Sequence, residues 1–162
     1  MRWQEFSVQC PELAAAARDR FVADQLVLLG TIRSDGAPRL SPCEVDFAAD
    51  ELMLGMMWRS RKALDLRRDP RLAVLSLPAG KDNPGGDVKL DGRAVEVADP
   101  DLRERYCQAI EARIAWHPTG DYHLFVLDVE RAATVRFDPA DGMMTVRRWR
   151  PGTEVSTERR PG

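Results

Sequence analysis

The sequence is poor in the residues that define several large functional classes. Its 162 residues include three cysteines, Cys10, Cys43 and Cys107, which form no CxxC pair. This count predicts reduced thiols and favours neither a disulfide framework nor a zinc site. The two histidines, His117 and His123, have no metal-ligand spacing around them, so we expect structural or exposed positions for both. No Ser-His-Asp spacing or nucleophile elbow is present, and hydrolysis is not indicated.

Long apolar runs are also missing. No segment approaches the roughly 20 consecutive apolar residues that a membrane-spanning helix needs. The residues after Met1 lack the apolar run of a signal peptide, and we therefore expect a cytoplasmic protein. The 24 basic and 26 acidic residues leave a net charge of -2, which gives no overall attraction to nucleic acid or anionic membranes. Any positive site must therefore be local.

The composition that remains is that of an ordinary globular protein, with 44% hydrophobic and 31% charged residues. The length fits one domain. We assign this domain to residues 1–150. Residues 151–162 are polar and have no apolar periodicity, and we expect them to be a disordered tail.

Short apolar segments separated by turn signals predict a protein made mainly of β-strands. The turn Ser34-Asp35-Gly36-Ala37 suits a hairpin, and Pro38 and Pro42 place the strand after it at an edge or a bulge. Because most connections are of hairpin length, we expect an antiparallel sheet that closes, or nearly closes, into a barrel. The expected strands are 26–33, 39–47, 51–57, 71–77, 87–98, 122–130, 132–137 and 143–149.

Three segments have the features of helices. Residues 11–25 begin with a proline and carry one apolar stripe, and residues 60–68 change to a helical period before Asp69-Pro70. A third helix begins at Asp99-Pro100. Its expected buried face carries apolar residues at every fourth position, Leu102, Tyr106, Ile110 and Ile114. Residues 78–86 are expected to be a loop.

One stretch combines basic residues with the start of a helix. In Met57-Trp58-Arg59-Ser60-Arg61-Lys62-Ala63, three cations and a hydroxyl lie where a strand gives way to a helix. The free backbone N–H groups and the helix dipole favour an anion there, and a phosphate monoester is a natural occupant. The alternative is a solvated surface cluster, since short basic clusters at helix starts are common.

The wider pattern resembles the pyridoxamine 5'-phosphate oxidase-like family over residues 20–150. The resemblance rests on the Ser-Asp-Gly-x-Pro hairpin at 34–38, on Ser60-Arg61-Lys62, and on the short helix that ends in Arg68-Asp69-Pro70-Arg71. Members of this family, including relatives that use the deazaflavin F420, are antiparallel split β-barrels with peripheral helices. The resemblance implies a flavin-binding homodimer with two cofactors at the subunit interface.

The family's cofactor-binding positions fall on ten residues of this chain. By the resemblance, Ser60, Arg61 and Lys62 would contact the cofactor phosphate. The positions that line the flavin ring or the ribityl chain in relatives are Ser41, Pro42, Cys43, Glu44, Met56, Met57 and Asp87. Ser41 replaces a phosphate-binding arginine of the oxidase, and the methionines replace polar or aromatic residues. These departures argue against activity on pyridoxamine phosphate. For Cys43 and the methionines, packing in the core is the ordinary alternative.

The resemblance implies an oxidoreductase that uses FMN to move a hydride to or from a small organic substrate. The cofactor carries this chemistry, and no catalytic residue is assigned. A terminal phosphate monoester suits Ser60-Arg61-Lys62, which favours FMN; F420 is the alternative. A second alternative is a non-catalytic flavin- or haem-binding module. Nucleic-acid binding through the basic stretch is disfavoured, because no series of base-stacking aromatics accompanies it.

Overall fold

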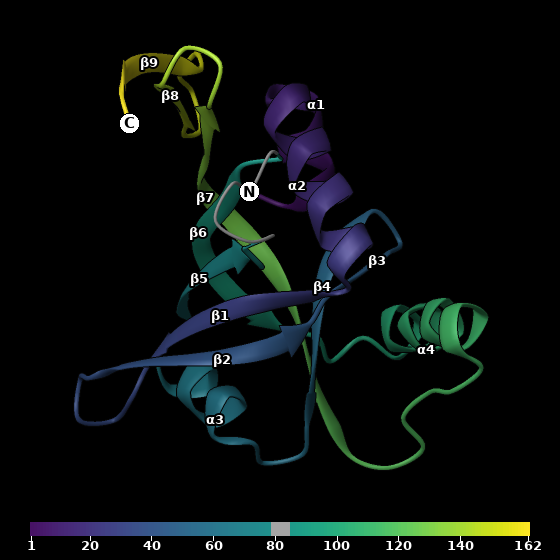
Figure 1. Cartoon of the computed structure of the whole chain (residues 1–162). Coiled ribbons are helices and arrows are strands. Elements are labelled where there is room, and N and C mark those ends of the chain that lie inside the picture. Colours follow the sequence, from purple (N-terminus) through teal and green to yellow (C-terminus); the bar gives the residue numbers. More distant parts are fainter. Residues whose placement is uncertain (79–84) are drawn as a thin grey trace.

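The computed structural model describes residues 1–78 and 85–162, which form four helices and nine strands (Figure 1). The helices are α1 (Trp3–Gln9), α2 (Pro11–Asp24), α3 (Arg61–Arg68) and α4 (Pro100–Ile114). The strands are β1 (Leu26–Ile32), β2 (Pro38–Glu44), β3 (Asp46–Ala48), β4 (Glu51–Met57), β5 (Arg71–Ser76), β6 (Asp87–Glu96), β7 (Tyr122–Asp138), β8 (Met143–Trp149) and β9 (Ser156–Pro161). The loop expected at 78–86 lies largely outside the described residues.

All strand pairs are antiparallel and belong to one sheet, in the order β2-β1-β5-β6-β7-β4-β3, with β8 and β9 extending from β7. The sheet curls until β2 approaches β4, where the Sγ atom of Cys43 lies 3.8 Å from the carbonyl oxygen of Gly55. The two strands are not neighbours in the hydrogen-bonded order, so the barrel is split at this point. The prediction of a mainly antiparallel split β-barrel with peripheral helices is confirmed.

Hydrophobic side chains cover both faces of the curled sheet. The larger cluster lies inside the barrel and includes Phe6 of α1 and Phe21 of α2. A smaller cluster lies on the outer face, where Tyr106 and Ile110 of α4 pack against β3, β4 and β7. In Figure 1, α3 and α4 lie on opposite sides of the lower ends of β4 and β7. No helix in the described ranges has both the length and the hydropathy needed to cross a membrane.

Two predictions of strand bounds differ from the structure. Residues 39–47 were expected to form one strand, and residues 122–137 to form two, 122–130 and 132–137. The first is divided at Val45 into β2 and β3. The second is a single strand, β7, because Glu130 forms a bulge: Asp91 pairs with Arg131, and Gly92 pairs with Val129. A Cβ atom on Gly92 would lie 1.9 Å from the carbonyl oxygen of Asp128, so only glycine permits this approach of the two backbones.

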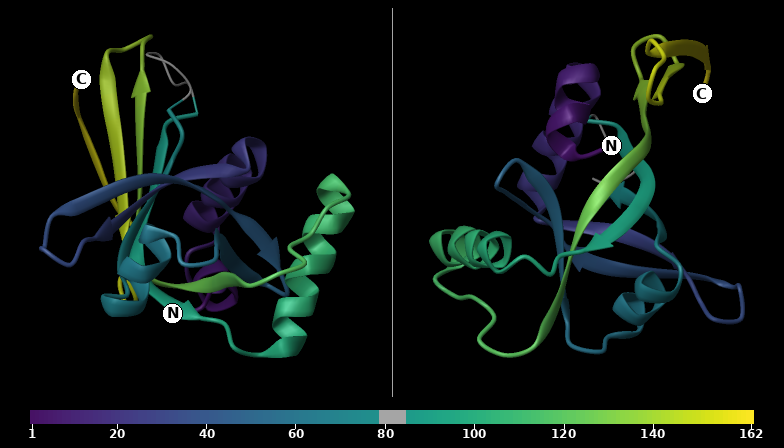
Figure 2. Two further views of the ribbon diagram at one scale, coloured as in Figure 1. Left: turned by 90° about the horizontal axis from the view of Figure 1, so that it is seen from below. Right: turned by 180° about the vertical axis from the view of Figure 1, so that it is seen from behind.

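The C-terminal segment differs from the expected disordered tail, because residues 156–161 form β9 along the edge of β8. Every residue of β9 is exposed, so the strand has no alternation of apolar and polar residues that would predict it. Backbone pairing and ion pairs hold it, among them Arg148 with Glu158 and Arg159 with Asp141. Figure 2 shows β8 and β9 alongside the C-terminal part of β7, which projects with them from the barrel. The short helix α1 was not expected either.

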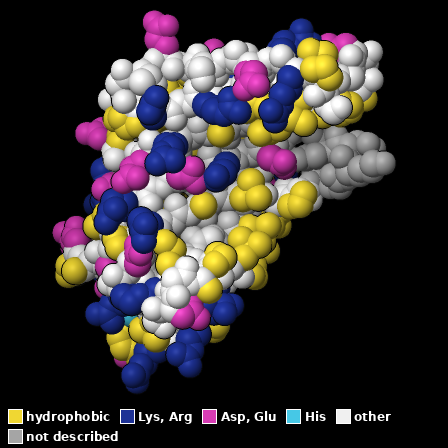
Figure 3. All heavy atoms as spheres, turned by 90° about the vertical axis from the view of Figure 1, so that its left-hand side faces the viewer, with side chains coloured by type: hydrophobic (Ala, Val, Ile, Leu, Met, Phe, Trp, Pro, Cys, Tyr) yellow, Lys and Arg dark blue, Asp and Glu magenta, His cyan; other side chains and the backbone are white. Residues whose placement is uncertain are grey.

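Charged side chains of both signs are mixed on one face of the molecule. On the face shown in Figure 3, Lys and Arg side chains alternate with Asp and Glu. Non-specific binding to nucleic acid relies on a positive groove or stripe that follows the phosphate backbone. This face presents no stripe of that kind.

Candidate functional site

A cleft of about 570 Å³ opens beside the split of the barrel. One wall is formed by β2, β4 and the first turn of α3, and the other by α4 and the segment that connects it to β7. Five of the ten predicted residues line it: Pro42, Glu44, Met56, Met57 and Lys62. The rest of the lining comes from Leu26, Gly55, Trp58, Tyr106, Trp116, Pro118, Thr119, Gly120, Asp121 and Tyr122.

A tight turn leads from β4 to α3 at the edge of this cleft. The backbone N–H of Ser60 donates to the carbonyl oxygen of Met57 at 3.1 Å, and Arg59 closes the turn with φ of 55°. A non-glycine residue at positive φ stores strain, of the kind that concentrates at functional sites. The turn places Ser60 at the N-cap of α3, ahead of helical N–H groups that have no partner within the helix.

The hydroxyl of Ser60 does not cap this helix. Its Oγ atom is buried and makes no hydrogen bond to any residue in the ranges 1–78 and 85–162. A buried hydroxyl without a partner costs free energy unless a ligand or water satisfies it. The atom therefore marks a place for a polar ligand group at the start of α3.

The side chains of Lys62 and Arg61 lie differently at this helix end. The Nζ atom of Lys62 donates to the carbonyl oxygen of Pro42 at 2.6 Å, which joins the first turn of α3 to β2 across the cleft wall. Arg61 is exposed and makes no ion pair with the described residues. Both cations therefore lie near the start of α3, where an anion would bind. The side chain of Lys62 is held by Pro42, whereas no ion pair with a described residue holds that of Arg61.

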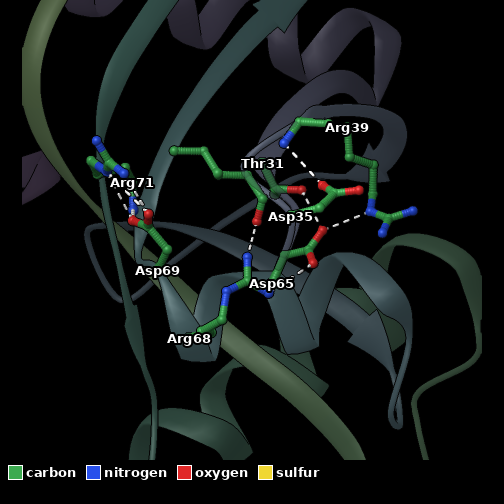
Figure 4. Close-up of polar contacts among 9 residues, drawn as sticks. Thr31, Asp35, Arg39, Asp65, Arg68, Asp69 and Arg71 are labelled. Carbon is green, nitrogen blue, oxygen red and sulfur yellow. Dashed lines mark hydrogen bonds and ion pairs between the residues drawn. The ribbon is translucent and has the colours of Figure 1, made fainter.

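The buried carboxylate of Asp65 anchors α3 to the β1–β2 hairpin (Figure 4). It accepts hydrogen bonds from Thr31 Oγ1 at 3.0 Å, from Arg39 Nε at 2.6 Å and from Arg68 Nη1 at 3.4 Å. Arg68 also donates to the carbonyl oxygen of Ile32. Burial by itself would raise the pKa of Asp65, but the hydrogen bonds from Arg39, Thr31 and Arg68 outweigh it and hold the pKa below its ordinary value.

Three of the other predicted residues lie beside the cleft or away from it. The thiol of Cys43 is fully buried, and burial raises its pKa to about 11, so it packs as a small neutral side chain. Ser41 is half-buried in β2 opposite Leu29. Asp87 begins β6 opposite Val135, at the far end of that strand from the cleft. The cleft lining includes none of these three residues, and it includes Lys62 but neither Ser60 nor Arg61 from the start of α3.

The two methionines of β4 contribute to the cleft in different ways. Met56 is buried and belongs to the barrel core, whereas Met57 is 79% exposed. This difference follows from the alternation of side chains along a strand. Met57 therefore offers an apolar, adaptable surface to a ligand, and Met56 mainly supports the wall.

Sequence reasoning missed most of the aromatic lining. Trp58 stacks on the buried ring of His123, with centroids 4.6 Å apart, and His123 Nδ1 lies 2.8 Å from Glu96 Oε1. Tyr106 comes from α4, Trp116 from the segment after it, and Tyr122 from the start of β7. Only Trp58, next to Met57, had a local signal; the others approach the cleft through the tertiary fold.

The chain is similar in sequence to a known protein family and similar in fold to several solved structures. The family model for pyridoxamine 5'-phosphate oxidase matches residues 13–136. The conserved hypothetical protein Rv2991 from Mycobacterium tuberculosis is 25% identical, with a TM-score of 0.61, over 73% of this chain and 81% of that chain. None of the curated proteins compared by sequence is similar enough to count as a match.

Two further solved structures share the fold at lower identity. A pyridoxamine 5'-phosphate oxidase-related, FMN binding protein from Nostoc punctiforme is 16% identical, with a TM-score of 0.65 and coverage of 94% of this chain and 96% of that one. A heme binding protein from Mycobacterium smegmatis is 18% identical, with a TM-score of 0.56, over 89% of this chain and 57% of that one. The fold therefore occurs both in an FMN-binding and in a haem-binding protein.

Proposed function

Because the chain belongs to the pyridoxamine 5'-phosphate oxidase family, we propose that the cleft binds FMN and that the protein is an FMN-dependent oxidoreductase. The observation that carries the proposal is the buried, unpartnered hydroxyl of Ser60 at the start of α3, beside Lys62. A phosphate monoester would supply the acceptor that this hydroxyl lacks among the described residues.

The phosphate would be held by three kinds of group. The backbone N–H groups of the first turn of α3 are directed at it, the hydroxyl of Ser60 donates to it, and Lys62 and Arg61 neutralise its charge. The bond from Lys62 to the carbonyl oxygen of Pro42 keeps the ammonium group close to β2. Asp65, through its bonds to the β1–β2 hairpin, keeps the whole helix in place.

The rest of the cleft suits a flat ring system. Its volume lies in the range of small-molecule sites, and its walls are mainly apolar and aromatic, with Met57, Trp58 and Trp116 among the lining residues. When bound, FMN supplies the hydride chemistry. The residues of this chain would orient the ring and exclude water from it, and we propose a small organic molecule as the substrate.

F420 and haem are the alternatives within this fold. F420 would offer an internal phosphodiester to the same residues, with less negative charge for Lys62 and Arg61 to neutralise than a terminal monoester has. A haem-binding module is supported by the similarity to the heme binding protein from Mycobacterium smegmatis. The absorption spectrum of the loaded protein separates the three ligands.

We further propose a homodimer that covers the cleft. Several large apolar side chains near it are exposed, among them Met57, Trp58 and Trp116. Exposed apolar patches of this kind mark interfaces or ligand sites, and a second copy of the chain would bury them. The cofactor would then lie between the two subunits.

Titration of the purified protein with FMN tests this proposal. We expect saturable binding in wild type and a loss of about 1–3 kcal/mol of binding free energy in Lys62→Ala, which is the usual contribution of a charge-assisted hydrogen bond. The matched control is Arg105→Ala, which removes one positive charge from an exposed position on α4. Quenching of flavin fluorescence gives the dissociation constants.

Two results would contradict the proposal. If wild type binds no FMN, the cleft is not a flavin site. If Lys62→Ala and Arg105→Ala bind FMN equally well, the phosphate lies elsewhere. A haem Soret band in protein reconstituted with haem, together with no flavin binding, would favour the haem-binding alternative.

A further inference from the structure

Tyr106 of α4 reaches the cleft through a gap that glycine leaves in β4. The Tyr106 side chain is 2% exposed, and both Tyr106 and Gly55 line the cleft. A Cβ atom on Gly55 would lie 1.7 Å from the hydroxyl oxygen of Tyr106 and 2.8 Å from its Cζ atom. The hydroxyl thus lies directly over the backbone of residue 55, in space that any other residue would fill. The hydroxyl end of Tyr106 therefore lies at the wall of the cleft, beside Gly55.

The hydroxyl of Tyr106 makes no hydrogen bond with any residue in the ranges 1–78 and 85–162. Two neighbouring polar groups of the lining are engaged: Lys62 donates to the carbonyl oxygen of Pro42, and the Tyr122 hydroxyl lies 3.4 Å from Cys107 Sγ. Unlike the Ser60 hydroxyl, the Tyr106 hydroxyl is not fully buried, so it is open to the cleft. An unpaired hydroxyl at the wall of an apolar cleft therefore points to a ligand atom as the missing partner.

The chemistry of the group limits what that partner is. Burial, with smaller contributions from Asp46 and Glu44, raises the pKa of Tyr106 above its ordinary value, so the group stays protonated and can donate. The matching ligand atom is an acceptor, either a carbonyl oxygen or an unprotonated ring nitrogen. Met57, Trp58 and Trp116 in the same lining suit a flat ring.

We propose that the Tyr106 hydroxyl donates a hydrogen bond to a carbonyl oxygen or ring nitrogen of the heteroaromatic ring bound in the cleft, and that Gly55 is required because it makes room for this hydroxyl. This rests on the proposed function, in which the ring is that of FMN. Tyr106 then recognises the ring, while Ser60 and Lys62 recognise the phosphate. The two contacts are separable, because riboflavin has the ring without the phosphate.

The test compares FMN and riboflavin binding to wild type, Tyr106→Phe and Lys62→Ala by quenching of flavin fluorescence. Tyr106→Phe is expected to weaken both ligands by the same factor of about 2 to 12, the net worth of one neutral hydrogen bond. Lys62→Ala is expected to weaken FMN much more than riboflavin. Ser7→Ala, which removes a hydroxyl bonded to the Trp3 carbonyl far from the cleft, is the matched control and leaves both affinities unchanged.

Thermal unfolding of the flavin-free protein separates ligand binding from a structural role. Removing a hydroxyl that has no partner among the described residues costs the folded protein no internal hydrogen bond, so the melting temperature of Tyr106→Phe should equal or exceed that of wild type. Equal dissociation constants for wild type and Tyr106→Phe with both flavins would overturn the assignment of Tyr106 and leave FMN binding intact. A wild-type protein that binds neither flavin would overturn both proposals.

Discussion

At the scale of single residues, Asp65 is the polar side chain with the most connections at the site. It is 5% exposed and accepts hydrogen bonds from three side chains, Thr31 of β1, Arg39 of β2 and Arg68 of α3. Asp65→Asn keeps the shape but removes the charge that pairs with Arg39 and Arg68. We expect the free energy of unfolding at pH 7 to fall by about 1–3 kcal/mol, measured by chemical denaturation.

The lowered pKa of Asp65 makes this effect depend on pH in a defined direction. A carboxyl whose pKa is lower in the folded than in the unfolded protein stabilises fully above its unfolded value, which is about 3.9. The contribution is lost as the pH falls through the lower, folded pKa. The difference between wild type and Asp65→Asn should therefore be constant near neutrality and shrink in acid. A difference that grew below pH 4 would contradict this account.

Residue-level prediction from the sequence succeeded where the signal was local. Lys62 and Met57 lie in one continuous stretch with a strand-to-helix transition, and both line the cleft. Tyr106 was expected as a buried residue of a helix, and it is one. Its approach to Gly55 could not be predicted, because the two residues are 51 positions apart and their contact depends on how α4 packs against β4.

At the scale of elements, helices and strands with strong local signals were predicted closely. The strands β4 and β8 have the expected bounds, and α4 begins as expected, with Asp99 Oδ1 accepting a hydrogen bond from the N–H of Asp101 at 3.0 Å. The edge position expected from Pro38 and Pro42 is also confirmed, since β2 is the first strand in the sheet order. Sequence periodicity could not predict β9, because this exposed strand has no apolar pattern. It is held by its pairing with β8 and by surface ion pairs.

The exposed strand β9 should contribute little to the stability of the barrel. It buries no side chain of its own, and its ion pairs lie at the surface, where such pairs are worth about 0–1 kcal/mol. Removal of residues 156–162 is therefore expected to lower the melting temperature by only about 2–4 °C, which corresponds to about 1 kcal/mol for a domain of this size. Circular dichroism during heating measures the change, and a fall of more than about 10 °C would show that β9 supports the barrel.

At the scale of the whole molecule, the exposed apolar rim of the cleft, formed by Met57, Trp58 and Trp116, is the basis for the proposed homodimer. Light scattering should give about twice the monomer mass of 18.2 kDa. Trp116→Asp places a charge on an exposed aromatic of this rim, and we expect it to shift the flavin-free protein toward monomer.

The matched control for this experiment is Val8→Asp, which places the same charge on an exposed apolar residue of α1. It should leave the dimer intact, because Val8 does not line the cleft. A wild-type mass of one chain, or equal dissociation of the two variants, would argue against an interface over the cleft.

The strand β7 joins two regions of the molecule that differ in how well the backbone is protected. From Leu124 to Val129 it is almost wholly buried and pairs with β4 on one side and β6 on the other. Beyond the bulge at Glu130 it pairs with β6 and β8, and its side chains there are mostly half-buried or exposed. Because the side chains before the bulge are more deeply buried, we expect the amide hydrogens there to exchange more slowly than those after it. Hydrogen exchange along this one strand should therefore show two lifetimes, the longer of them in the part that pairs with β4.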